Sequence, residues 1–474
     1  MELILLPFIA AFITFMAKGK TAKLVAILSA SFQLVLTAIM LFKFNAAGNT
    51  NFELNYPWIP QMGINFRIGF DGISMMLAIL TNILSFLIIF SSNRDENDRA
   101  GLFYGLILLM QSALIGVFTS LNGFVFYLFW ELALIPIYLI CGIWGEGSNK
   151  IQITLKFFIY TFAGSLLMLA SLIYLAAHAN GSFDYEALFQ AQLSDAESLL
   201  VALGFFIAFA IKMPVFPFHT WQPQTYTMAP AQGSMLLSGI MLKMGVYGVI
   251  RWMIPLVPKG VIQFQSTIII LAIIGIVYGA IIAIRQNDLK KIIAYSSFSH
   301  VGLIAAGAFV FSLQGIQGSM IQMFCHGINI VGLFFAIDII EKRTGTRDIK
   351  ELGGIVSSAP RFAILFMVVL LGSVAVPLTN GFIGEFLLLK AVFDYQAILA
   401  LVAGLTVIFC AVYMLRIYQL AIFGEVKEKT TNFEDLNWME FTTLGIIGIL
   451  VLAIGVYPQW LLNLTEASVM NLIK

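Results

Sequence analysis

Charged residues are scarce in this sequence: only 11% of its 474 residues are Asp, Glu, Lys or Arg, whereas 60% are hydrophobic. Ordinary soluble domains carry about 25% charged residues, so the composition excludes a soluble globular protein. It predicts an all-α polytopic membrane protein, with the lipid bilayer as its surroundings. The formal net charge of +1 gives no reason to expect a nucleic-acid partner.

Cysteine is rarer still, with three residues in the whole sequence. Cys141, Cys325 and Cys410 lie in apolar stretches without CxxC spacing, so neither disulfides nor iron–sulfur ligation is expected. The sequence also lacks a Walker A motif, a GxGxxG run that opens a helix after a strand, and an HExxH pair. We therefore expect no metal and no cofactor in this chain, and any electron chemistry must take place on another subunit.

Long apolar runs make up most of the sequence. A run of about 17–25 apolar residues is long enough to cross a bilayer as a helix. Glu2 precedes the first run and Lys18 follows it, which predicts a first span with its tail outside rather than a cleaved signal peptide. We expect about fourteen spans, near residues 3–17, 23–42, 70–92, 101–120, 122–144, 153–177, 199–220, 229–254, 262–284, 290–311, 315–340, 361–393, 396–422 and 440–463.

The distribution of Lys and Arg orients these spans. Eighteen of these residues lie in or beside the loops after odd-numbered spans, and five lie on the opposite side. The positive-inside rule then places the odd loops in the cytoplasm and both termini outside. The remaining three, Lys212, Lys243 and Lys390, fall inside spans.

Proline interrupts two of the spans, at Pro214 in 199–220 and at Pro377 in 361–393. A proline inside a helix removes one N–H donor and displaces the carbonyl four residues back, so Pro214 is expected to free the carbonyl of Ala210. Loose backbone of this kind is tolerated in a bilayer only beside protein or trapped water.

The two interrupted spans occupy corresponding places in the sequence. Lys212 and Glu385 lie 173 residues apart, as do Lys243 and Arg416. A shift of five helices reverses the direction through the membrane, so we expect two inverted five-helix repeats, spans 4–8 and 9–13, with broken helices 7 and 12. The predicted parts are a three-helix segment at 1–100, repeat 1 at 101–255, repeat 2 at 256–425, and a loop with the last span at 426–474.

Seven of the ionisable residues within these spans form the candidate site. A charged side chain at the bilayer centre costs roughly 2.5–3.5 kcal/mol on insertion scales and marks an ion pathway unless it snorkels to an interface. Acid and base groups in a row can hand protons along, because imidazole takes and releases protons near neutral pH. The candidates are Glu131, Lys212, His219, Lys243, His300, His326 and Glu385.

Each of these residues also has a simpler interpretation. For a histidine this is a packed, hydrogen-bonded ring, and for His219, beside the proline-rich break, the sequence supports both interpretations equally. Glu131 needs a partner, and the lysine of a neighbouring span is the natural one. Gly239 and Gly245 flank Lys243 and are expected to allow close helix contact there.

Other charged residues near the span ends are expected to have local roles. Lys390 has Asp394 four residues further on, so a local ion pair explains it as well as a role in transfer does. Four acidic residues are expected to face headgroups or loops: Asp71, Asp288, Asp338 and Glu341.

Seven long motifs, in this order, resemble the antiporter-like subunits of complex I (NADH–quinone oxidoreductase) and of multisubunit cation/proton antiporters. The resemblance covers about residues 65–425 and is highly specific because all seven occur together. The motifs are FWELALIPIYLICGIWG, LKFFIYTFAGSLLML, FAIKMPVFPFHTW, MLKMGVYG, DLKKIIAYSSFSHVG, FCHGINIVGLFF and TNGFIGEFL.

The resemblance implies a subunit that couples electron transfer to proton pumping in a bacterial inner membrane. NADH, FMN, iron–sulfur clusters and quinone would then lie on partner subunits, with L-like and N-like antiporter subunits as neighbours. A carboxylate at position 385 is typical of the M-type members. The family roles carried over are a span-5 glutamate at Glu131 that pairs with Lys212, a central lysine at Lys243, family histidines at His300 and His326, and a terminal carboxylate at Glu385.

One loop departs from the family pattern. Gln224, Tyr226 and Met228 stand where the family has ionisable residues, so no role in proton uptake is carried over to this loop. The alternatives that the sequence leaves open are a subunit of a sodium/proton antiporter or of a membrane-bound hydrogenase, a structural spacer that conducts nothing, and a solute transporter.

Overall fold

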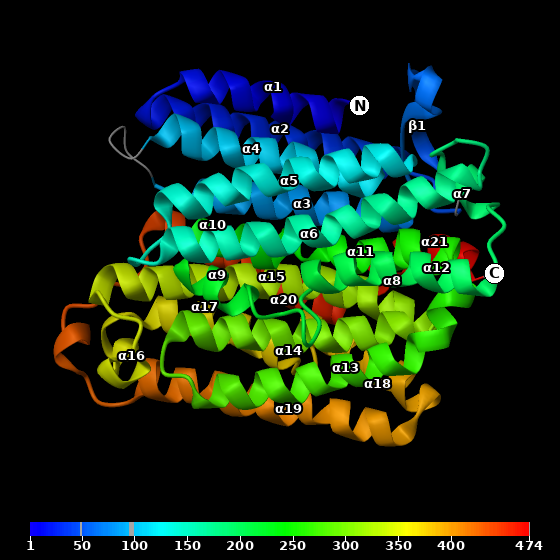
Figure 1. Cartoon of the computed structure of the whole chain (residues 1–474). Coiled ribbons are helices and arrows are strands. Elements are labelled where there is room, and N and C mark those ends of the chain that lie inside the picture. Colours follow the sequence, from blue (N-terminus) through cyan, green and yellow to red (C-terminus); the bar gives the residue numbers. More distant parts are fainter. Residues whose placement is uncertain (48–49, 94–98, 474) are drawn as a thin grey trace.

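The computed structural model describes residues 1–47, 50–93 and 99–473, and nearly all of its elements are helices. Eleven described helices are long and apolar enough to cross a membrane, and α1 (Glu2–Met16) and α17 (Pro360–Val374) are shorter apolar helices. The long helices run side by side in one bundle (Figure 1). The expected all-α multi-pass membrane fold is confirmed, while the number of crossings stays a prediction.

The first part of the chain forms helices close to the predicted spans, with bounds that agree to within four residues. Asn122 caps α5 by accepting hydrogen bonds from the N–H groups of Phe124 and Val125, which fixes where this helix begins. After α1, the helices are α2 (Gly19–Lys43), α3 (Gly72–Ser91), α4 (Ala100–Thr119), α5 (Gly123–Trp144) and α6 (Lys150–Ala177).

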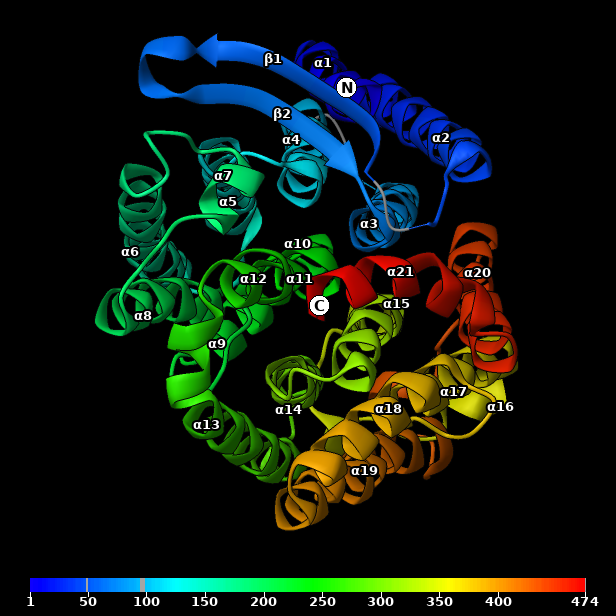
Figure 2. The ribbon, with the colours of Figure 1, turned by 90° about the vertical axis from the view of Figure 1, so that its right-hand side faces the viewer.

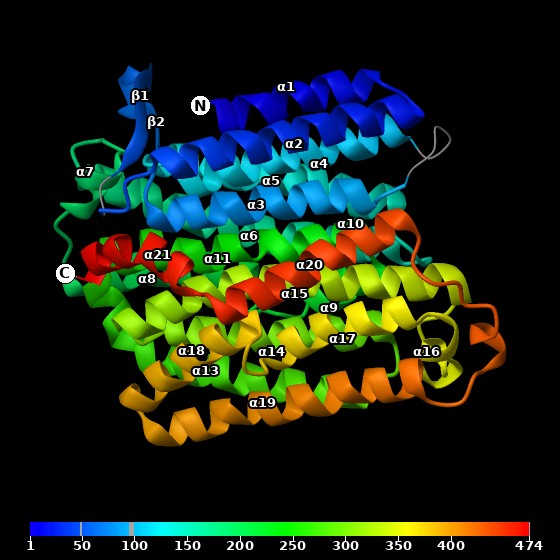
Figure 3. The ribbon, with the colours of Figure 1, turned by 180° about the vertical axis from the view of Figure 1, so that it is seen from behind.

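A β-hairpin, which the sequence analysis did not predict, joins α2 to α3. Strand β1 (Asn51–Ile59) pairs antiparallel with β2 (Ile64–Phe70), and Gly63 adopts φ +65° in the turn between them. The hairpin lies at the end of the bundle that also carries α7 (Tyr185–Phe189) and α21 (Gln459–Ile473) (Figure 2). Both ends of the chain lie toward this same end (Figures 1 and 3).

The predicted break in span 7 is confirmed between α8 (Asp195–Lys212) and α9 (Gln222–Met228). The carbonyl of Ala210 that Pro214 displaces is not left free, however, because it accepts a hydrogen bond from the N–H of Val215 at 2.8 Å. The backbone of the break is thus satisfied inside the protein, as an apolar environment requires.

The next span is helical throughout but contains two π-helical turns. It comprises α10 (Ala231–Leu236), a π-turn (Leu237–Met241), α11 (Lys243–Gly248), a second π-turn (Val249–Met253) and α12 (Ile254–Leu256). A Cβ on Gly245 would lie 2.7 Å from the backbone nitrogen of Met213, and one on Gly239 would lie 2.7 Å from Val331. The expectation that these glycines allow close helix contact is confirmed.

The remaining helices surround α14 and α15, which are buried along almost their whole length (Figure 2). Their bounds are α13 (Pro258–Arg285), α14 (Leu289–Phe309), α15 (Leu313–Thr344), α16 (Ile355–Ser358), α17, α18 (Asn380–Tyr395), α19 (Ala397–Ile417) and α20 (Trp438–Val456). The predicted break in span 12 is confirmed between α17 and α18, where Ala375 adopts φ +61°. The span expected at 440–463 is wrong at its end, because the chain leaves α20 at Tyr457 and begins α21 after Pro458.

We predict that Gly245→Ala destabilises the protein by about 1–3 kcal/mol, because the new methyl group would overlap the backbone of the α8–α9 break, which cannot move away cheaply. Thermal unfolding of the assembled protein in detergent measures this effect. Gly445→Ala is the matched control, since a Cβ there meets no atom within 4 Å. Equal melting temperatures for the two variants would contradict the prediction.

Candidate functional site

Four of the predicted site residues meet in the centre of the bundle. Lys243 Nζ lies 2.9 Å from His326 Nδ1, and the rings of His326 and His300 are 6.1 Å apart between their centroids. His300 Nδ1 in turn lies 2.9 Å from Glu385 Oε1. These side chains come from α11, α15, α14 and α18, and each is at most 5% exposed. The structure therefore arranges amine, imidazole, imidazole and carboxylate in a row, which we call the central row.

The π-turn before α11 determines where the amine of Lys243 lies. Lys243 Nζ donates a hydrogen bond to the carbonyl of Ser238, five residues earlier, at 2.6 Å. A π-turn widens the helix and leaves a carbonyl available to a side chain, and such turns are frequent at functional sites. Lys243 is fully buried without a carboxylate partner among the described residues, so a carbonyl and an imidazole satisfy it.

A small cavity lies beside the two histidines. The residues that line it include His300, Gln322 and His326, and its volume of about 10 Å³ is roughly what one water molecule needs. His326 Nε2 has no hydrogen-bond partner among the described residues. A single water in this cavity could bond to polar groups such as His326 Nε2 and the side-chain oxygen of Gln322.

Lys212 and Glu131 form a second, separate part of the site. Lys212 is 2% exposed, and its Nζ lies 5.2 Å from the ring centroid of Trp130. Within the described part of the chain, neither Lys212 Nζ nor Glu131 Oε1 has a hydrogen-bond partner. The two charges are close enough to interact electrostatically, but they form no direct ion pair, contrary to what the resemblance implied.

The geometry of α5 explains this separation. Successive residues project about 100° apart around a helix. Trp130 packs against Phe209 of α8, with 5.6 Å between ring centroids, so Glu131 is directed elsewhere and interacts with Ser165 of α6. The cation of Lys212 therefore faces the aromatic ring rather than the carboxylate.

His219 lies apart from the central row. Its ring stacks on Phe298 at 4.3 Å and on Phe216 at 5.7 Å, and it meets the edge of Tyr278 at 5.3 Å. This aromatic surround matches the packed-ring interpretation, and a role for His219 in transfer stays a prediction.

Sequence reasoning missed several polar groups around the row. Gln322 Nε2 approaches Glu385 Oε1 at 3.5 Å, and Cys410 Sγ lies 3.4 Å from His300 Nε2. Amide side chains inside apolar spans were the available signal, because buried amides normally require partners. For Cys410 no sequence signal existed, since a lone cysteine in an apolar helix resembles any small core residue.

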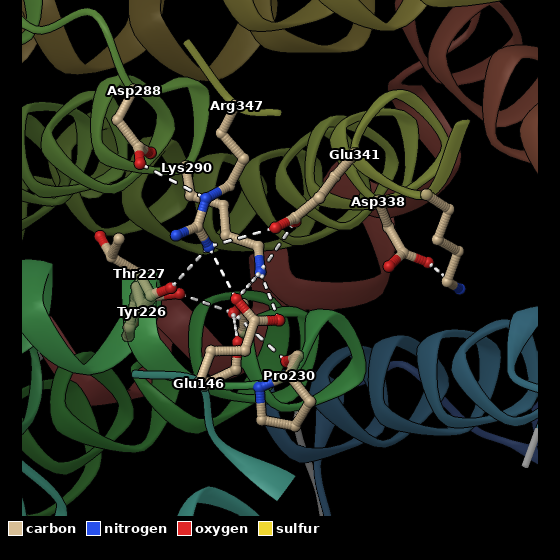
Figure 4. Close-up of polar contacts among 12 residues, drawn as sticks. Glu146, Tyr226, Thr227, Pro230, Asp288, Lys290, Asp338, Glu341 and Arg347 are labelled. Carbon is tan, nitrogen blue, oxygen red and sulfur yellow. Dashed lines mark hydrogen bonds and ion pairs between the residues drawn. The ribbon is translucent and has the colours of Figure 1, made fainter. Parts of the chain in front are cut away.

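A second group of charges, which we name the loop-end ion cluster, comprises Glu146, Asp288, Lys290, Glu341 and Arg347 (Figure 4). Lys290 Nζ lies 3.3 Å from Glu146 Oε1 and 3.2 Å from Glu341 Oε2. Arg347 reaches Glu146 at 2.8 Å and Asp288 at 3.4 Å. Glu146 follows α5, whereas the other four belong to the second half, so the cluster ties the two predicted repeats together.

The acidic residues expected to face headgroups or loops therefore have protein partners instead. Asp338 pairs with Lys342 at 2.6 Å. Asp71 is 5% exposed and lies 2.7 Å from the buried Arg251. For Asp71 the expectation was wrong because its partner, Arg251, lies 180 residues further along the chain, whereas Lys342 follows Asp338 by four residues on the same helix. The local pair of Lys390 with Asp394 is confirmed.

The fold and this site define the class of protein: a multi-pass helical membrane protein with a row of ionisable groups inside its bundle. Residues 120–410 match the family model described as NADH:quinone oxidoreductase/Mrp antiporter, transmembrane. The chain belongs to this family.

Particular relatives are similar over nearly their whole length. The chain is 39% identical to NADH-quinone oxidoreductase subunit M of Rickettsia conorii, over 95% of this chain and 92% of the relative. It is 35% identical to NADH-ubiquinone oxidoreductase chain 4 of Marchantia polymorpha, over 100% and 96%. A chain of respiratory complex I from Thermus thermophilus with bound NADH has a TM-score of 0.92 at 29% identity, with 100% and 99% covered.

We predict that Lys290→Met lowers the stability of the protein by about 1–3 kcal/mol. The side chain of Lys290 is 1% exposed, and its removal would leave Glu146 and Glu341 with Arg347 as their one remaining partner cation in the cluster. The effect is reduced because Glu146 and Glu341 are partly exposed. Lys291→Met, at the exposed neighbouring position, is the control in thermal unfolding, and a similar loss in both variants would contradict a specific role for the cluster.

Proposed function

We propose that this chain is the M-type, proton-translocating membrane subunit of a respiratory NADH–quinone oxidoreductase. The observation that carries the proposal is the row from Lys243 through His326 and His300 to Glu385 within an apolar bundle, with direct contacts at its two ends and a water-sized cavity beside the two histidines. Ionisable groups at such depth are costly and mark ion pathways by default. Membership of the family and similarity along the whole chain support the same function.

The central row moves a proton by exchange between neighbours. Lys243 gives a proton to His326 at Nδ1, and His326 releases one from Nε2 toward the water-sized cavity that His300 also lines. His300 then delivers a proton from Nδ1 to Glu385. Each imidazole takes a proton on one nitrogen and loses one from the other, so the ring must change tautomer before the next transfer.

Lys212 and Glu131 control when a proton enters this row. A change of charge in the adjacent subunit would alter the attraction between them and thereby the proton affinity of Lys212. Gly245 of α11 packs directly on the backbone at Met213, so the end of α8 that carries Lys212 abuts the helix that carries Lys243. The proton of Lys212 then passes toward Lys243 and the central row.

The driving energy has to come from partners. Moving one charge against a membrane potential costs about 2.3 kcal/mol per 100 mV. NADH, FMN, iron–sulfur clusters and quinone belong to other subunits in this proposal, so the chain itself performs no redox step. L-like and N-like antiporter subunits are its membrane neighbours, and both termini lie on the outer side of a bacterial inner membrane. Residues 101–255 and 256–425 act as the two inverted repeats.

We predict that Lys243→Ala and Lys212→Ala each reduce NADH-driven proton pumping at least tenfold in proteoliposomes that contain the intact complex. The reason is that alanine cannot hold a proton at either point of the path. Lys390→Met is the control, since Lys390 is half-exposed and paired with Asp394 outside the row. Pumping at the normal rate by an assembled Lys243→Ala complex would refute the proposal.

A second candidate, a subunit of a multisubunit cation/proton antiporter, follows from the family description, which includes both kinds of complex. We predict that the chain, purified gently from native membranes, brings with it partners that oxidise NADH and contain iron–sulfur clusters. Optical and electron paramagnetic resonance spectra of the purified assembly measure this. An assembly without any redox centre would favour the antiporter instead.

A further inference from the structure

A line of polar side chains, which we call the file, starts at His300 of the central row and continues between α14 and α19. Cys410 Sγ lies 3.4 Å from His300 Nε2, whereas Glu385 approaches the other ring nitrogen. The imidazole of His300 thus has a different partner on each nitrogen. Cys410 is 1% exposed, and its thiol also approaches the carbonyl of Ser373 at 3.4 Å.

The file continues one helical turn further. Tyr413 donates a hydrogen bond from its hydroxyl to Ser296 Oγ at 3.0 Å, and the same hydroxyl interacts with Cys410. Cys410 and Tyr413 are three residues apart on α19, and Ser296 and His300 are four apart on α14, so each pair shares one helix face. The four side chains form the sequence His300, Cys410, Tyr413, Ser296, and none is more than 3% exposed.

A second polar contact lies between α14 and α19. Ser299 Oγ and Thr406 Oγ1 lie 3.4 Å apart, both fully buried between the two helices. Most of α19 is apolar, and packing alone requires neither a thiol nor hydroxyls at these positions. Groups that both donate and accept protons are the ones suited to pass a proton along.

The file leads from the row toward the loop end of the bundle. Ser296 is nearer than His300 to the start of α14 at Leu289, where Lys290 of the loop-end ion cluster lies. At the same end, Arg416 of α19 donates to the carbonyls of Ile284 and Gln286. By the charge distribution of the loops this is the predicted cytoplasmic side.

We propose that Cys410 and Tyr413 are additional relay residues, and that with Ser296 they form a branch that supplies protons to His300 from the loop end. The inference rests on the proposed function of the central row. The Tyr413 hydroxyl first turns from Ser296 to Cys410. Cys410 then gives its S–H proton to His300 Nε2 while it takes the proton of the Tyr413 hydroxyl, Tyr413 takes the proton of Ser296, and a hydronium ion from the loop end reprotonates Ser296 and leaves as water. His300 passes one proton from Nδ1 to Glu385, so each of the four side chains of the file gives and receives one proton.

Tyr413→Phe and Cys410→Ala test this branch in the intact complex in proteoliposomes. We expect NADH-driven proton pumping to fall about tenfold in both, since a positioned proton carrier contributes at least this much. Cys410→Ser should restore pumping, because a hydroxyl also donates and accepts. A packing role alone predicts no such difference between alanine and serine. The infrared S–H band assigned to Cys410 by its loss in Cys410→Ser should shift in Tyr413→Phe.

Two matched controls lie outside the file. Tyr418→Phe removes a hydroxyl that donates only to the carbonyl of Ala363, and Cys141→Ala removes a buried thiol of α5. Both should pump normally. Tyr413→Phe removes a single oxygen, so it decides the matter if Cys410→Ala fails to assemble.

The outcomes separate the two proposals. If Lys243→Ala stops pumping while assembled Tyr413→Phe and Cys410→Ala pump normally, the branch is refuted and the central row stands. If Lys243→Ala also pumps normally, the proposed function itself is refuted.

Discussion

The burial of a lysine amine in the centre of an apolar bundle is the constraint on which the rest of the site depends. Lys243 is completely buried, and an amine in such a place is tolerated only if its donors are bonded. The carbonyl of Ser238 and the imidazole of His326 meet this need. Because the partner is an imidazole and not a carboxylate, the contact can exchange a proton instead of fixing a charge.

Broken helices follow from the same constraint. In the interior of a continuous α-helix every carbonyl bonds to an N–H group of the same helix, so none is left for a buried cation. The π-turn before Lys243 supplies such a carbonyl at Ser238, whereas the break after α8 gives the amine of Lys212 no hydrogen-bond partner among the described residues. The carbonyl of Ala210 nevertheless finds a donor in Val215, so the chain breaks its helix geometry without leaving this buried carbonyl unsatisfied.

The two parts of the site differ in how tightly they are connected. The central row is continuous through direct contacts and one water-sized cavity, whereas Lys212 and Glu131 interact only at a distance. A loose pair responds to a change in the surrounding field more easily than a closed one, which suits a control element. The loop-end ion cluster holds the two halves together while this part responds.

Hydrophobic length and proline act locally, so the amino-acid order alone predicts the membrane class, the long spans, both breaks and the six residues proposed for the relay. Which of these residues touch depends on the packing of the folded chain. His300 and Glu385 are 85 residues apart yet adjacent, Trp130 faces Lys212 in place of Glu131, and Cys410 joins His300. Such contacts depend on how helices rotate and pack against one another, and neither composition nor periodicity within a single helix carries that information.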